Sequence, residues 1–166
     1  MINGIEGIKR IRLGSLEPRI VTEEFAKRLA ACEKICPHFH LSLQSGCDAT
    51  LIRMNRKYTT GEFAEGVKIL RRYFDNPAIT TDLIVGFPGE TQEEFDVTYE
   101  YLKRIKFYEL HVFKYSRRKG TMADKMPDQV DEQIKSARSD RLLELDEKRS
   151  TQYREKYIGK DICVLT

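Results

Sequence analysis

Strand-like and helix-like segments alternate along the chain from its first residues to about Glu109. Short runs rich in Ile, Val, Leu and Phe are typical of buried parallel strands, and the longer segments between them carry apolar residues at helical spacing. No Ser-, Gly- or Pro-rich linker and no internal repeat interrupts this order. The alternation requires parallel strands joined by right-handed helical crossovers, so we predict an α/β fold, either a barrel or a doubly wound sheet.

Four strands and three helices are predicted in this region. The strand segments are Ile8–Leu16, Phe39–Gln44, Ile79–Phe87 and Leu110–Tyr115. Each helix is predicted to begin where a threonine precedes acidic residues, because threonine caps the first turn and carboxylates favour the positive end of the helix dipole. These starts are Thr22-Glu23-Glu24, Thr60-Gly61-Glu62 and Thr91-Gln92-Glu93-Glu94. Four strands are too few for a closed barrel of about eight, so we expect an open sheet or one part of a larger enzyme.

The sequence after Pro127 changes character. Charged residues dominate a long amphipathic stretch, and we predict one surface helix over Asp131–Tyr157 whose apolar stripe packs on the sheet. Ile162–Leu165 is predicted to begin a further strand that is cut off at Thr166. The apolar stripe of the predicted helix consists of Ile134, Leu142, Leu145 and Tyr153.

The first predicted strand also lies close to Met1 without an upstream neighbour. Together with the cut-off strand at Thr166, this makes us expect the chain to be a fragment.

Composition excludes several classes of protein. At 166 residues, with 40% hydrophobic and 33% charged residues, the chain has the size and composition of one globular domain. No apolar run approaches the roughly 20 residues of a membrane span, and no signal peptide follows Met1, so we expect a cytoplasmic protein. A net charge of +3 is too small to indicate nucleic-acid binding by itself.

Polar residues interrupt the predicted strands near their carboxyl ends, where parallel sheets bind ligands. Gln44 ends the second strand, and Asp82 lies inside the apolar third strand. A buried aspartate must be hydrogen-bonded or paired, and ribose hydroxyls would satisfy it, while Gly86 and Gly89 would let a flat ring approach the backbone. The alternative is a glycine-proline turn with Asp82 bonded to a neighbouring strand.

Four longer motifs lie in a fixed order along nearly the whole chain. They are Arg10-Ile-Arg-Leu-Gly-Ser-Leu-Glu-Pro18, His38-Phe-His-Leu-Ser-Leu-Gln-Ser-Gly-Cys-Asp48 followed by Met54-Asn-Arg-Lys-Tyr-Thr59, Thr81-Asp-Leu-Ile-Val-Gly-Phe-Pro-Gly-Glu-Thr91, and His111-Val-Phe-Lys-Tyr-Ser-Arg-Arg-Lys-Gly-Thr121. In sequence, order and spacing they resemble the radical SAM methylthiotransferases. Within that family they are most similar to the tRNA threonylcarbamoyladenosine methylthiotransferase branch.

The resemblance implies a fold and a domain organisation. It implies an open parallel half-barrel of about four βα units, a partial radical SAM barrel, followed by a long helix. Residues 1–126 would form the partial barrel and 127–158 a helical extension. Residues 159–166 would begin a truncated RNA-binding strand of a TRAM-like domain.

The resemblance also implies a ligand and its contacts. Family barrels contact S-adenosylmethionine from the ends of successive strands, through a glutamine, an arginine on the following helix and a strand aspartate. Gln44, Arg56 and Asp82 occupy the matching places, and their chemistry suits ribose hydroxyls and the methionine carboxylate. The other implied contacts are Ser15, Gly86, Phe113 and Tyr115.

The reaction implied for the whole enzyme adds a methylthio group to a tRNA adenosine next to the anticodon, with S-adenosylmethionine and 4Fe–4S clusters. The cluster needs the spacing C-x-x-x-C-x-x-C. Cys32 and Cys36 supply the first gap, but Phe39 takes the third position, so the cluster ligands are expected outside this chain, which alone would be inactive. A zinc site formed with His38 and His40 is conceivable by ligand type, and packing of both thiols in the core is the simpler interpretation.

Two surfaces are candidate interfaces. Arg117, Arg118 and Lys119 follow the fourth strand and would contact tRNA phosphates, unless they form a solvated loop. The free edge of Ile8–Leu16 is expected to promote self-association. A rival to the enzyme hypothesis is a cluster-free nucleic-acid-binding or scaffold module derived from the same barrel.

Overall fold

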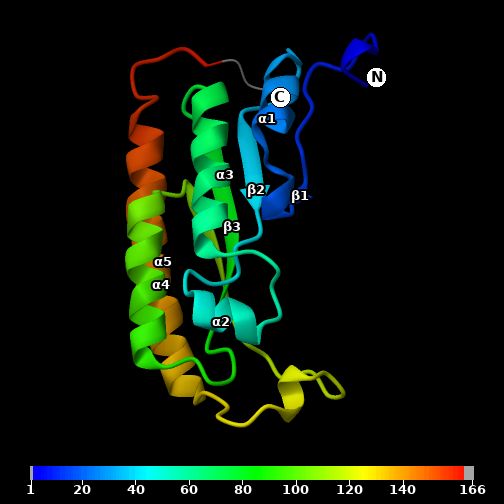
Figure 1. Cartoon of the computed structure of the whole chain (residues 1–166). Helices are drawn as coiled ribbons and strands as arrows, with labels where there is room; N and C mark the ends of the chain where they lie inside the picture. The colour runs from blue at the N-terminus through cyan, green and yellow to red at the C-terminus, as the bar shows by residue number, and fades with distance from the viewer. Residues whose placement is uncertain (1, 163–166) are drawn as a thin grey trace.

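The computed structural model describes residues 2–162 and shows a four-stranded parallel sheet with the strand order β1-β2-β3-β4 (Figure 1). This confirms the predicted open parallel α/β sheet. The strands are β1 Ser15–Leu16, β2 His38–Leu41, β3 Ala78–Val85 and β4 Glu109–Lys114. The helices are α1 Glu23–Ala30, α2 Asp48–Arg53, α3 Thr60–Tyr73, α4 Gln92–Ile105 and α5 Glu132–Glu155, with short 3-10 turns at Ile2–Gly4, Pro18–Ile20 and Ala123–Lys125.

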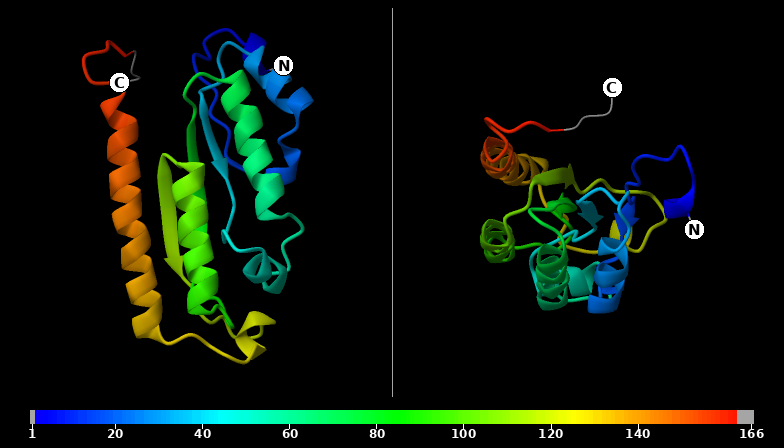
Figure 2. Two further views of the ribbon diagram at one scale, coloured as in Figure 1. Left: turned by 60° about the vertical axis from the view of Figure 1, so that its left-hand side comes forward. Right: turned by 90° about the horizontal axis from the view of Figure 1, so that it is seen from above.

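Helices cover one face of the sheet and leave the other open. Seen from above, α1, α3 and α4 lie on one side of the strands, and α5 runs beside β4 (Figure 2). Alternate strand residues point into the core formed with these helices. Phe39 and Leu83 from the sheet, Phe63 from α3, and Phe95 and Leu102 from α4 are at most 1% exposed. The opposite face carries polar side chains and no helical cover.

Local capping explains where three helices begin. Thr22 and Thr91 are the N-caps of α1 and α4, as predicted, and Thr91 forms a full capping box with Glu94. The predicted start of α3 is one residue late, because Thr59 rather than Thr60 is the cap and closes a capping box with Glu62.

The first predicted strand is largely wrong. Within Ile8–Leu16 only Ser15–Leu16 pairs with β2, and Ile11 forms an isolated parallel bridge with Ile35. The remaining residues are extended and partly or fully exposed. The neighbouring strand β2 begins only at His38, which leaves most of the run without a partner, and three of its residues are basic. The expected self-association through this edge stays a prediction.

Helix α5 confirms the long predicted helix. It also contributes buried residues to the core, so it is more than a surface helix. Leu142 and Leu145 belong to the core, and Asp146 Oδ1 accepts a 2.6 Å hydrogen bond from the backbone N–H of Leu110 on the outer edge of β4. Ile134, by contrast, is 45% exposed and lies outside the apolar stripe. Of the strand predicted from Ile162, residues 163–166 lie outside the described residues. None of the helices in residues 2–162 is long and apolar enough to cross a membrane.

Candidate ligand-binding site

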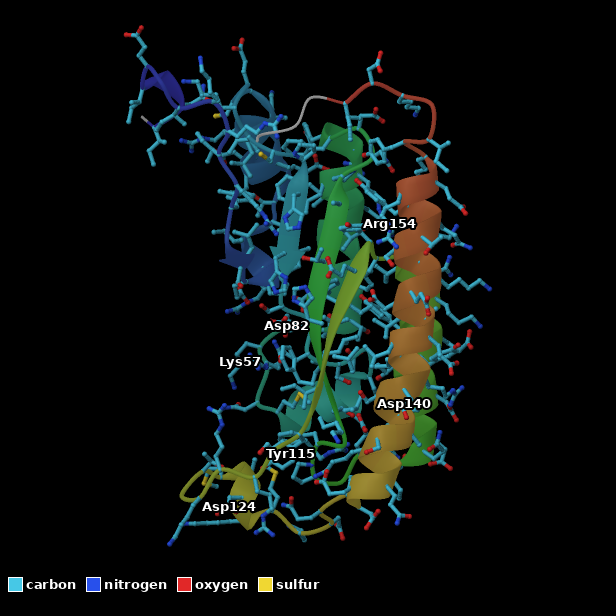
Figure 3. All side chains as sticks on the ribbon, turned by 180° about the vertical axis from the view of Figure 1, so that it is seen from behind. Lys57, Asp82, Tyr115, Asp124, Asp140 and Arg154 are labelled. Carbon is cyan, nitrogen blue, oxygen red and sulfur yellow. The ribbon has the colours of Figure 1, made fainter. Side chains whose placement is uncertain are left out.

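Two adjoining hollows lie on the open face of the sheet, and Asp82 on β3 lines both of them. The first hollow, about 450 Å³, lies between β1, β2 and β4 and includes Ser15. The second, about 570 Å³, lies toward the carboxyl ends of β3 and β4 and includes Gln44, Phe113 and Tyr115. Figure 3 shows Asp82 on this face and Tyr115 nearer to the loop that follows β4.

Asp82 is bonded to histidines on both neighbouring strands. His40 Nε2 on β2 lies 3.2 Å from Oδ2, and His111 Nδ1 on β4 lies 3.2 Å from Oδ1. The two imidazoles stack with ring centroids 5.2 Å apart. The carboxylate therefore has partners inside the protein, as the alternative interpretation held. Each oxygen can still accept a further hydrogen bond, and Asp82 lines both hollows.

Gln44 is fixed by its backbone and free at its side chain. Its N–H donates to Asp82 O at 2.9 Å, its carbonyl accepts from Ile84 N at 2.9 Å, and its φ of 70° turns the chain away from β2. The residue is 9% exposed and lines the second hollow. Within residues 2–162 no group hydrogen-bonds to the side-chain amide. A ligand in the hollow would find there an unpaired amide group, which can both donate and accept.

Two aromatic residues on the same wall differ in their surroundings. Phe113 is 54% exposed, so it is not the core residue that an aromatic side chain on a strand usually is. Tyr115 packs edge-on against Phe87 at 5.3 Å between centroids and lies under Lys135 Nζ at 5.5 Å. Phe113 therefore offers a ring face to a ligand, whereas the ring of Tyr115 is already packed.

Gly86 does not provide the open approach for a ring that the sequence predicted. The Lys135 stem from α5 fills the space that a Cβ would need, with Cδ 3.1 Å from that position. The N–H of Gly86 donates to Glu90 Oε2 at 2.7 Å, and Glu90 is in turn paired with Arg138 of α5. The absence of a side chain at Gly86 thus lets α5 pack closely against this turn. Gly89 also has no open space beside it, because it lies against Arg53.

Arg56 does not lie on the helix after β2, as the resemblance implied. Helix α2 ends at Arg53, and Arg56 is an exposed residue of the following loop that lines neither hollow. The arginine that is on the helix, Arg53, is occupied: its Nη1 donates to Glu94 Oε1 at 2.8 Å and its Nη2 bonds Glu94 Oε2. This hydrogen bond raises the pKa of Arg53 and lowers the pKa of Glu94.

The lowered pKa of Glu94 makes stability depend on pH. A carboxyl group with a depressed folded-state pKa adds stability above its unfolded value, near 4.5, and that stability is lost as pH falls through the lower folded value. We expect Glu94→Gln, which preserves the capping box, to flatten the loss of unfolding free energy between pH 7 and pH 3. Urea unfolding across this range measures it. Glu100→Gln, at an exposed pair with Lys103, is the control and should change little.

The basic loop after β4 is partly engaged within the protein. Arg117 Nε donates to Asp124 Oδ1 at 3.1 Å and Nη2 to the Asp124 carbonyl at 2.9 Å, so Arg117 holds the loop together. Arg118 lines the second hollow and Lys119 is exposed. Of the three predicted RNA contacts, Arg118 and Lys119 are therefore the accessible ones.

Cys32, Cys36 and Cys47, the cysteines within residues 2–162, belong to no group of metal-ligating side chains there. Cys32 and Cys36 are partly exposed, which corrects the prediction that both are core thiols, and Cys47 is the buried one. In the described part of the chain neither Cys32 nor Cys36 joins a group of three metal-ligating side chains, so the zinc alternative with His38 and His40 finds no support. The residues present also do not fit a 4Fe–4S cluster, because Phe39 stands at the third ligand position.

Sequence reasoning missed His40 and His111 as site residues. Both lie in the quoted motifs, and His40 was considered only with the cysteines. The alternation of strand residues could have found them, because residues two apart lie on one face of a strand. Residues 38 and 40, 80 and 82, and 109 and 111 thus lie on the same face of adjacent strands.

Comparison with known proteins agrees with this architecture. Residues 2–102 match the family model of the radical SAM superfamily. The fold superposes on coproporphyrinogen III oxidase from Escherichia coli, described as a radical SAM enzyme, with a TM-score of 0.65 at 20% identity. That match covers 87% of this chain and 32% of the other, and it shows the fold alone.

The sequence relatives are tRNA-modifying enzymes. The chain is 46% identical over 153 residues to the threonylcarbamoyladenosine tRNA methylthiotransferase MtaB of Bacillus subtilis, covering 92% of this chain and 34% of the relative. It is 44% identical to the protein of the same name from Aquifex aeolicus, covering 97% and 39%. It is 42% identical to the tRNA-2-methylthio-N(6)-dimethylallyladenosine synthase of a Thermoanaerobacter species, covering 99% and 35%. The chain thus spans about a third of the length of the curated relatives it matches.

Proposed function

The chain belongs to the radical SAM superfamily, with tRNA methylthiotransferases as its relatives, and from that membership we propose that it holds S-adenosylmethionine for the methylthiolation of a tRNA adenosine next to the anticodon. The observation that carries the proposal is the second hollow, where the unpartnered Gln44 amide and the exposed Phe113 ring share one wall. In the whole enzyme S-adenosylmethionine, with 4Fe–4S clusters, supplies the radical and the methyl group.

The residues of the hollow have separate tasks in this proposal. Phe113 would stack on the adenine, because every base presents a π face to an aromatic ring. Gln44 would donate to and accept from the ribose or the methionine group, and Asp82 would use its remaining lone pairs for ribose hydroxyls. Ser15 would contact the ligand from the first hollow. Arg56 and Gly86 are not included, because they lie outside both hollows.

The tRNA would approach from the carboxyl ends of the strands. Arg118 and Lys119 would bind its phosphates at the rim, and Arg117 would keep their loop folded. We propose residues 1–126 as the partial barrel and 127–158 as its helical extension, with an RNA-binding strand starting in 159–166. A protein with these tasks acts in the cytoplasm, where tRNA is modified.

Ligand binding tests the proposal. We expect the purified chain to bind S-adenosylmethionine in calorimetry carried out with a chelator present. Phe113→Ala should weaken binding by about 1–3 kcal/mol through lost stacking, and Gln44→Ala by about 1 kcal/mol. Val97→Ala on α4, with the same 54% exposure as Phe113, is the matched control and should bind as the unmodified chain does.

Two results would contradict it. Equal binding by the unmodified chain and Phe113→Ala would place the ligand elsewhere. A folded chain that binds tRNA but not S-adenosylmethionine would support the rival function, a cluster-free nucleic-acid-binding module.

A further inference from the structure

Two histidines and one aspartate converge at one level of the open face. His40, Asp82 and His111 come from β2, β3 and β4, and one ligand atom of each lies within 4.8 Å of the others. In the described chain this is the one group of three His, Cys, Asp or Glu side chains so arranged. Rigid, hydrogen-bonded strands hold all three side chains, because Asp82 and His111 are paired in the sheet register and His40 is aligned with Thr80.

The distance from each imidazole nitrogen to the carboxylate suits a shared metal ion, and the three ligand atoms, within 4.8 Å of one another, would draw closer around it. A first-row metal binds imidazole nitrogen and carboxylate oxygen at about 2.0–2.2 Å, which separates neighbouring donor atoms by roughly 3.0–3.5 Å. His40 Nε2 lies 3.2 Å from Asp82 Oδ2, and His111 Nδ1 lies 3.2 Å from Asp82 Oδ1. Without an ion the same distances fit two N–H donors on one carboxylate, so spacing alone does not decide between the two.

The second nitrogen of each ring lies near a polar side chain outside the group of three. Metal-binding histidines commonly donate their other N–H to a polar group, which fixes the tautomer. His40 Nδ1 lies 3.0 Å from Thr80 Oγ1, and His111 Nε2 lies 3.8 Å from the Glu109 carboxylate. With no ion bound, Asp82 accepts from His40 Nε2 and His111 Nδ1, so metal binding would move each proton to the other ring nitrogen, which lies beside Thr80 Oγ1 in His40.

The first hollow leaves room for further ligands. It opens directly onto the three side chains and also includes Ser15 and Arg12. Arg12 is turned to His38, with Nε 3.2 Å from Nδ1 and Nη2 3.0 Å from Nε2, so its charge is directed at a neighbouring ring. The two carboxylates, Asp82 and Glu109, balance the charge of a divalent ion.

We propose that His40, Asp82 and His111 bind one divalent transition-metal ion through two imidazoles and one carboxylate, with open coordination positions facing the first hollow. This donor set is the one that non-haem iron sites use and also suits zinc. The proposal does not depend on the proposed function, and it is separate from any iron–sulfur cluster, because no cysteine takes part.

Titration of the chelator-stripped chain with Zn²⁺ and Co²⁺ tests the site. We expect one equivalent of Zn²⁺ to bind and to raise the unfolding temperature, and Co²⁺ to give d–d absorption without a thiolate charge-transfer band. Asp82→Asn and His111→Gln should each lower Zn²⁺ affinity by at least about tenfold, because each variant removes one of the three ligands. His38→Gln, on the same strand as His40 but outside the group, is the matched control and should retain affinity.

Folding and thiols are controlled separately. Circular dichroism in chelator shows whether each variant is folded, and His111→Gln, at a half-exposed position, provides the answer if Asp82→Asn does not fold. Three results would overturn the proposal: no saturable binding of one equivalent, thiolate-to-cobalt absorption that disappears in Cys32→Ser/Cys36→Ser, or equal Zn²⁺ affinity in the unmodified chain and folded His111→Gln.

Discussion

Replacing Arg138 by methionine while Glu90 remains is expected to cost about 3–5 kcal/mol of unfolding free energy, because it leaves a carboxylate buried without its cation. The side chains of Arg138 and Glu90 are 6% and 2% exposed, and Arg138 Nη1 lies 2.6 Å from Glu90 Oε2. The same nitrogen donates to the Glu90 carbonyl at 3.1 Å. Burial raises the pKa of Glu90 in spite of this partner, so desolvation is the dominant influence on the carboxyl group. Urea unfolding at pH 7 measures the loss.

Two further variants show whether burial of the charge is the cause. The double variant Glu90→Gln/Arg138→Met removes both charges and should recover much of the lost stability. Arg141→Met on the same helix breaks an exposed pair with Asp96 and should cost at most about 1 kcal/mol. If Arg138→Met and Arg141→Met cost the same, the buried pair does not hold α5 to the sheet.

Gly86→Ala is expected to destabilise the chain by about 2 kcal/mol or more, through two separate effects. Gly86 has a φ of 70°, which costs an L-residue about 1–2 kcal/mol. The new Cβ would also overlap the Lys135 stem, and such overpacking typically costs about 1–3 kcal/mol. Thermal or urea unfolding of the variant gives the sum.

Gly120→Ala separates the two effects. Gly120 has a φ of 89°, and no atom lies within 4 Å of the place that an added methyl carbon would take, so only the conformational cost applies there. The double variant Gly86→Ala/Lys135→Ala should lose less unfolding free energy than the two single variants lose together, because the shortened side chain leaves room for the new Cβ. Strict additivity of the two changes would show that Lys135 does not press on this turn.

Local chemistry made much of the fold predictable. The threonine caps at Thr22 and Thr91 depend only on their own turns, and both were predicted correctly. Strands β3 and β4 were predicted to within two residues at each end, because their apolar residues are continuous and buried. The run Ile8–Leu16 failed, because whether a short mixed segment pairs depends on how far its neighbour β2 extends.

The site was predictable where the strand register alone places a residue. Gln44 and Asp82 follow from their places near the ends of predicted strands, Phe113 was implied by the family resemblance, and the structure brings all three to one hollow. The open space expected at Gly86 could not be judged from the sequence, because the side chain that fills it belongs to Lys135, 49 positions later. Arg56 was expected on a helix and lies in a loop, because helix α2 ends before it and a six-residue helix gives no clear periodicity.

The hydrogen bond between Leu110 and the Asp146 carboxylate affects whether another strand can be added to the sheet. A strand added beyond β4 would need the outward N–H of Leu110, and Asp146 already bonds that group while α5 lies along the same side (Figure 2). Strand addition at β4 would therefore require α5 to leave, with the buried Leu142 and Leu145. The β4 edge is thus closed to an extended peptide, whether a natural partner or an inhibitor that mimics a strand, for as long as α5 stays packed.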